Sequence, residues 1–175
     1  MAGHSKWKQI KHKKAATDAK KSKVFSKLAQ LISMEAKKSG GDINSSGLRA
    51  AIVKARALNM PAENIDRAIK KASEQKDDLE IITYEGYGPG GVGIIVEALT
   101  SNRNKASQEV KHAFSKHNGN LGTPGSVTWG FTKEEGAWVP TVSMPITDSD
   151  AEKLAVLVDA LEESEEVHEV YTNAE

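Results

Sequence analysis

Cysteine is absent from the 175 residues of this chain, and only 5% of the residues are aromatic. Without cysteine, neither a disulfide framework nor a thiolate metal site can form. No apolar run approaches the roughly 20 residues that span a bilayer, and the longest are short pieces such as residues 92–99. The first residues are basic but no apolar segment follows them, so we expect a cytoplasmic protein with no signal peptide and no membrane anchor.

Motifs of catalysis are missing as well. The chain has no Gly-x-Ser-x-Gly elbow, no His-Glu-x-x-His pair and no Walker loop. Its five histidines are scattered, and His112 and His117 are five residues apart, whereas two metal ligands on one helix face would be four apart. We therefore expect no enzyme: no catalytic or metal site, no cofactor and no small-molecule substrate.

Charge, in contrast, is plentiful and unevenly placed. The first 76 residues hold 18 Lys and Arg against 6 Asp and Glu, whereas the other 99 hold 6 against 18. A basic surface of this kind attracts polyanions, because lysines neutralise phosphates and an aromatic ring can stack on a base. The predicted nucleic-acid contacts are nine lysines and two interleaved rings: Lys6, Trp7, Lys8, Lys11, His12, Lys13, Lys14, Lys20, Lys21, Lys23 and Lys27. The plainer alternative is a solvated tail or helix face.

Hydrophobic spacing predicts three helices in the basic half. Apolar residues recur every three or four positions over residues 17–38, 46–59 and 61–72. Gly40 and Gly41 suit the end of the first helix, and Pro61 suits the first turn of the third. A polar stretch at residues 74–78 coincides with the change of charge sign. We therefore predict a basic three-helix domain over residues 1–76 and a second domain over residues 77–175.

The second half has the periodicity of strands. We predict strands at residues 81–85 and 92–100, a helix at 103–117, a hairpin of strands 126–132 and 138–144, a helix at 148–164 and a closing strand at 167–172. From residue 92 this order is βαββαβ. It predicts a ferredoxin-like domain with an extra N-terminal strand, in which two helices cover one face of an antiparallel sheet. The fold class is therefore α+β.

A glycine-rich segment at residues 86–93 matches the dinucleotide-binding fingerprint, but a strand follows it where the fingerprint needs a helix. We therefore predict a hairpin loop. Its backbone amides can face a phosphate, so Tyr87, Gly88, Gly90 and Gly91 are a second predicted nucleic-acid contact.

Several short motifs are distributed along the whole chain. They are MAGHSKW at residues 1–7, IKHKKAA at 10–16, NMP at 59–61, RAI at 67–69, YEGYGPGG at 84–91, NRN at 102–104, GNLG at 119–122, GSV at 125–127 and VYTN at 170–173. Together they resemble the YebC/PmpR family of probable transcriptional regulatory proteins. The resemblance implies a helical N-terminal domain beside α/β domains, a cytoplasmic or organellar setting and a nucleic-acid partner. Longer members carry a further α/β segment, which this chain replaces with residues 133–137.

The residues and the resemblance leave more than one function open. Members of the resembled family are described as promoter-binding regulators, and others, one of them mitochondrial, as translation factors that act on the ribosome. We predict a DNA-binding transcriptional regulator with promoter DNA as partner; the sequence does not give the oligomeric state, for which we favour a monomer. The alternative is a ribosome-associated translation factor that binds ribosomal RNA, which suits lysines because they contact phosphates without reading sequence. A third interpretation is a protein-interaction module whose basic and acidic halves bind one another.

Overall fold

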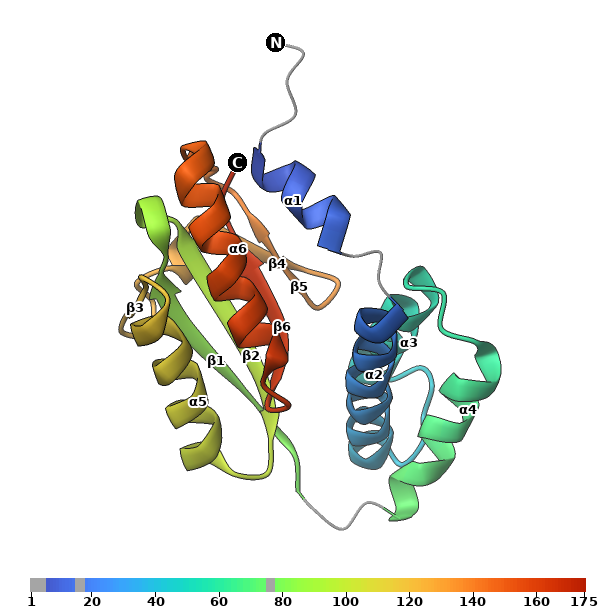
Figure 1. The fold of residues 1–175 in the computed structure, drawn as a ribbon. Coiled ribbons are helices and arrows are strands. Elements are labelled where there is room, and N and C mark those ends of the chain that lie inside the picture. Colours follow the sequence, from blue (N-terminus) through green and yellow to red (C-terminus); the bar gives the residue numbers. More distant parts are fainter. Residues whose placement is uncertain (1–5, 15–17, 75–77) are drawn as a thin grey trace. The chain divides into compact units, whose positions relative to one another are not determined.

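The computed structural model describes residues 6–14, 18–74 and 78–175, with the backbone alone at residues 12–14 and 18–19 (Figure 1). The chain divides into two compact units. The helical unit is Ala16–Leu79, and the sheet unit joins Met1–Ala15 to Glu80–Glu175. This division differs from the predicted domain of residues 1–76, because the first helix, α1 (Lys6–Lys14), packs on α6 (Asp148–Glu163) of the sheet unit.

The helical unit contains the three predicted helices. They are α2 (Asp18–Ser39), α3 (Ser46–Ala57) and α4 (Ala62–Lys70), and a short 3-10 turn, η1 (Lys71–Glu74), follows α4. Helix α2 contacts both α3 and α4, and its apolar face is buried between them. Gly40 and Gly41 follow its last residue, and their φ values of +63° and +85° are in the left-handed region that glycine accepts without strain.

The sheet unit is built on four strands in the order β3-β1-β2-β6, with every neighbouring pair antiparallel. These strands are β1 (Glu80–Tyr87), β2 (Gly93–Thr100), β3 (Asn120–Leu121) and β6 (Val167–Thr172). Helices α5 (Arg103–Lys116) and α6 cover one face (Figure 1). Their core includes Ile94 and Val96 of β2 together with Phe114 and Leu154 from the helices.

The predicted hairpin exists, but it is not part of this sheet. Strands β4 (Phe131–Glu134) and β5 (Ala137–Pro140) pair only with each other, and a 3-10 turn, η3 (Thr128–Gly130), replaces the start of the predicted strand. The reason is that β1 pairs with β2 over eight residues and occupies the position beside β2 that the hairpin would need. The hairpin instead helps to cover the other face of the sheet, where Phe131 clusters with Ile95. The α+β class is confirmed, and the predicted ferredoxin-like strand placement is corrected.

Candidate nucleic-acid interface

Helix α1 carries the first of the predicted lysines. Lys8 and Lys11 are exposed, and the Nζ atom of Lys6 lies 3.9 Å from the Oε1 atom of Glu152 in α6. Trp7 and Ile10 form a narrow apolar stripe on this helix, and Ile10 packs against the core of the sheet unit. The predicted side chains of His12, Lys13 and Lys14 lie outside the described residues. Helix α1 is therefore an amphipathic helix that presents cations outward while its apolar side is held on the sheet unit.

Trp7 differs from its predicted role. Only 6% of the residue is exposed, and it belongs to the core cluster that contains Leu154 and Phe114. A ring buried in this way has no free face to stack on a base. Trp7 is therefore a core residue that anchors α1, and the alternation of Trp7 and Ile10 with lysines reflects helix packing.

Helix α2 carries the second group of lysines. Lys20, Lys23 and Lys27 follow one another at three and four residues, so they share one side of the helix, and Lys21 is exposed on another side. The lysines of α1 belong to the sheet unit and those of α2 to the helical unit. The two helices are therefore two separate basic surfaces.

Two further cations, which are not among the predicted contacts, line a groove in the helical unit. Arg67 of α4 and Lys71 of η1 are exposed and four residues apart, and the groove between them and α2 has a volume of about 660 Å³. Helical spacing alone could have paired them, because residues four apart share a helix face. Only the packing of α4 on α2 shows that this face borders a groove.

The glycine-rich loop joins β1 to β2, which confirms the hairpin and excludes a dinucleotide site of the predicted fingerprint type. Within it, Gly91 N–H donates to the Gly88 carbonyl at 3.0 Å, and Gly90 and Gly91 have φ values of +77° and +78°. A Cβ at Gly90 would lie 3.1 Å from an oxygen of Asp150. A phosphate at this tip would therefore meet a carboxylate, which weakens the predicted contact through Gly90.

Beside the loop, two aromatic side chains share one acceptor. The Tyr87 hydroxyl donates to the carbonyl of Ser126 at 2.9 Å, and the indole N–H of Trp129 donates to the same oxygen at 2.8 Å. Trp129 is 73% exposed and Tyr87 40% exposed. With their polar atoms satisfied and their rings in solvent, they form an aromatic surface of the kind found at binding sites. Trp129 is not among the predicted contacts, because residues 126–132 are predicted to form a strand and a strand position gives no sign that the ring is exposed.

The buried carboxylate of Glu85 holds the segment that carries this acceptor. Its Oε2 accepts from Gly125 N–H at 2.7 Å, and its Oε1 accepts from Val127 N–H at 2.9 Å and Thr128 N–H at 2.7 Å. Burial alone would raise the pKa of Glu85, but these backbone donors outweigh it and the pKa is lowered. Glu85 thus stays ionised, and its hydrogen bonds hold the residues before and after Ser126, Gly125 and Val127, in place.

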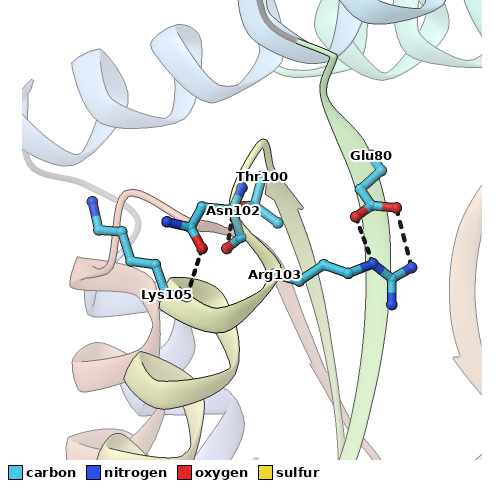
Figure 2. A network of polar contacts seen from close by, with 5 residues as sticks. All are labelled: Glu80, Thr100, Asn102, Arg103 and Lys105. Carbon is cyan, nitrogen blue, oxygen red and sulfur yellow. Dashed lines mark hydrogen bonds and ion pairs between the residues drawn. The ribbon is translucent and has the colours of Figure 1, made fainter.

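The NRN motif has a structural role at the start of α5 (Figure 2). The Asn102 side chain caps the helix by accepting from Lys105 N–H at 3.1 Å, and Thr100 Oγ1 accepts from Asn102 N–H at 2.9 Å. Arg103 donates two bonds to Glu80 of β1, at 2.6 and 3.1 Å, and the hydrogen bond from Arg103 lowers the pKa of Glu80. This network ties α5 to β1.

Neither a metal centre nor a membrane span is found among the described residues. No group of three or more His, Asp or Glu side chains in residues 6–14, 18–74 and 78–175 is arranged to hold a metal ion. Across the same residues, every helix is too short or too polar to pass through a bilayer.

Comparison with known proteins places the chain in a family. Residues 5–75 match the family described as "TACO1/YebC protein N-terminal domain", and residues 79–137 match "TACO1/YebC second and third domain". The chain belongs to the TACO1/YebC family. The structure is also similar to the crystal structure of a conserved hypothetical protein from Aquifex aeolicus, which is 31% identical, has a TM-score of 0.74, and is matched over 90% of this chain and 91% of that one.

Curated relatives are named probable transcriptional regulatory proteins. One from Desulforapulum autotrophicum is 50% identical over 86% of this chain and 61% of its own length, and one from Thermoanaerobacter pseudethanolicus is 55% identical over 76% and 55%. This chain thus spans little more than half the length of these relatives. The alignment with a Thermotoga petrophila relative, 36% identical, covers all of this chain and 94% of that protein over 238 positions, so that relative carries residues with no counterpart among the 175 here.

Proposed function

We propose that this TACO1/YebC member is a nucleic-acid-binding regulator of gene expression, and that it acts in the cytoplasm as a DNA-binding transcriptional regulator. The observation that carries the proposal is the pair of lysine-rich helices α1 and α2, with Lys8, Lys11 and Lys21 exposed. The names of the relatives, probable transcriptional regulatory proteins, support a regulatory role and one that is not enzymatic.

The lysines act by displacing counterions from the phosphate backbone. If about half of the nine predicted lysines touch phosphates, the logarithm of the binding constant for duplex DNA falls with the logarithm of salt concentration at a slope of about −4. Lysine contacts of this type position the protein without reading sequence. The exposed Tyr87 and Trp129 rings add a surface on which an unpaired base can stack.

A second function, that of a ribosome-associated translation factor, is favoured by one observation. Every cation among the predicted contacts on α1 and α2 is a lysine, and none is the arginine that most often reads guanine in the major groove. Ribosomal RNA is recognised largely through its shape, phosphates and unstacked bases. Lysine helices and exposed rings suit that kind of target.

The proposal is tested by titrating the purified chain at low ionic strength with duplex DNA, with ribosomal RNA and with whole ribosomes. The variant Lys11→Glu/Lys21→Glu reverses one exposed lysine on each basic helix, and Lys111→Glu/Lys116→Glu makes the same charge change on α5. We expect the first variant to weaken binding by roughly tenfold or more and the second to change it little. If the two variants weaken binding equally, α1 and α2 are not the binding site.

The two functions are separated in cells. Crosslinking followed by sequencing of both DNA and RNA yields discrete promoter peaks for a transcriptional regulator and ribosomal RNA reads for a translation factor. If the purified chain binds none of the three targets at low salt, the nucleic-acid function itself is wrong.

A further inference from the structure

The groove in the helical unit is lined from α2 by several small side chains. On α2 its lining residues recur at three and four positions and so share one helix face: Ser22, Phe25, Ser26, Ala29, Gln30 and Ser33. The hydroxyl of Ser33 donates to the Ala68 carbonyl of α4 at 2.7 Å, which holds the two helices together. Serine and alanine cannot fill the space further along, and a groove of about 660 Å³ is left open there.

The α4 side of the groove supplies positive charge. Arg67 and Lys71 both line it, and within residues 6–14, 18–74 and 78–175 neither forms an ion pair. This contrasts with the sheet unit, where Arg103 is paired with Glu80 and Lys105 with Glu166. Two exposed cations that have no carboxylate partner among the described residues are ready to bind an anion.

Apart from Glu74, the rest of the lining is neutral or apolar. Gln30 and Asn64 offer amide donors, Ser22 and Ser26 offer hydroxyls, and the half-buried ring of Phe25 gives a flat apolar surface. Glu74 is the one acidic residue in the lining, and it lies in η1 at the end of the segment. Cations, neutral donors and an aromatic face are the groups that proteins use to hold phosphates, sugars and bases of an unpaired strand.

We propose that this groove binds a single strand of nucleic acid, with Arg67 and Lys71 at its phosphates and Phe25 beneath a sugar or base. The inference rests on the nucleic-acid function proposed above and names where in the helical unit the strand lies. The groove volume of about 660 Å³ is in the range of sites that hold one small organic molecule, roughly 300–1,000 Å³, so it accommodates one or two nucleotides of a strand that continues along the open groove. A duplex keeps its bases stacked inside and cannot place one on Phe25.

Charge around the groove supports this occupant over an acidic peptide. Residues 16–79 hold 13 Lys and Arg against 8 Asp and Glu, and on α2 the positions of Lys23 and Lys27 are next to those of Ser26 and Gln30 around the helix. The basic side of α2 thus adjoins the groove, and a strand in the groove would have cations along its outer side. Neutral donors and Phe25 match sugars and bases, for which a carboxylate-rich peptide has no counterpart.

The first test reverses charge in the groove. The variant Arg67→Glu/Lys71→Glu is compared with Arg49→Glu/Arg56→Glu, which changes two exposed arginines of α3 that do not line the groove. The readout is fluorescence anisotropy with labelled oligouridine and oligothymidine over a range of salt concentrations. We expect the groove variant to weaken binding at least roughly tenfold and to reduce the salt slope by about 1.4, since each single-strand phosphate contact contributes about 0.7. The α3 variant should do neither.

The second test fills the groove without changing charge. Ser26→Phe adds bulk inside it, and Val53→Phe adds similar bulk at an exposed position of α3. We expect Ser26→Phe to weaken single-strand binding while duplex binding and the thermal unfolding of the protein stay unchanged, and Val53→Phe to alter none of them. Should Arg67→Glu/Lys71→Glu unfold the helical unit, Ser26→Phe and Arg67→Gln/Lys71→Gln decide the question.

The outcomes separate this inference from the proposed function. If both groove variants bind single strands as tightly as the α3 variants do, while Lys11→Glu/Lys21→Glu loses affinity, the groove assignment is wrong and the nucleic-acid function stands. If the unaltered chain binds no oligonucleotide, DNA, RNA or ribosome at low salt, both are wrong. Loss of single-strand affinity in the groove variants alone supports the groove.

Discussion

Replacing Glu85 with glutamine is expected to destabilise the sheet unit strongly. The glutamate is 7% exposed, and its two oxygens accept three backbone N–H groups from Gly125, Val127 and Thr128. Glutamine keeps one carbonyl oxygen and turns the other into an amide donor. At least one of the three N–H groups then faces a donor in place of an acceptor.

The size of the effect follows from these bonds. A buried donor left without an acceptor costs about 1–3 kcal/mol, and each of the two remaining bonds loses about 1 kcal/mol when its acceptor is no longer charged. We therefore expect Glu85→Gln to lower the free energy of unfolding by about 4 kcal/mol. At about 2–4 °C per kcal/mol for a chain of this length, the melting temperature falls by about 8–16 °C.

Thermal unfolding followed by circular dichroism at several pH values checks this expectation, with Glu134→Gln as control because Glu134 is exposed on β4. The pKa of Glu85 is lower in the folded state than its unfolded value of about 4.3. Its contribution is therefore complete above about pH 4.3 and is lost as the pH falls through the folded pKa. The stability gap between wild type and Glu85→Gln should shrink in acid. A variant as stable as wild type at pH 7, or a gap that widens in acid, would refute this account.

Three further substitutions separate core residues from surface residues. Trp7→Ala should lower the free energy of unfolding by about 3–5 kcal/mol in chemical denaturation, because the ring is in the core; a variant as stable as wild type would contradict its burial and restore a stacking role. Gly86→Ala should lower the melting temperature, since its Cβ would lie 2.6 Å from the Phe114 ring, whereas Gly130→Ala, with no atom within 4 Å of its Cβ, should not. Trp129→Ala should change stability by less than about 0.5 kcal/mol and remove most of the acrylamide-quenchable fluorescence; strong quenching left in the variant would contradict its exposure.

Local patterns predicted those parts of the fold that depend on near neighbours. The helices of residues 16–79 follow from apolar spacing, and the hairpin loop at Gly90 and Gly91 follows from a strand on either side of the glycines. The packing of α1 on α6 did not follow. The residues before α2 have the pattern of a charged segment. Trp7 and Ile10 are too few apolar residues to predict which surface α1 packs on.

The candidate interface divides in the same way. The charge imbalance, the lysines of α1 and α2 and the exclusion of the dinucleotide fingerprint are properties of the sequence, since they depend on residue identity and on the element that follows. The groove beside Arg67 and the shared acceptor of Tyr87 and Trp129 are properties of the tertiary structure. They arise where distant segments meet, and which segments meet is decided by competition among long-range pairings. The full-length pairing of β1 with β2 displaced the predicted hairpin from the sheet, and Glu85 bound the turn at Ser126 that now carries the aromatic surface.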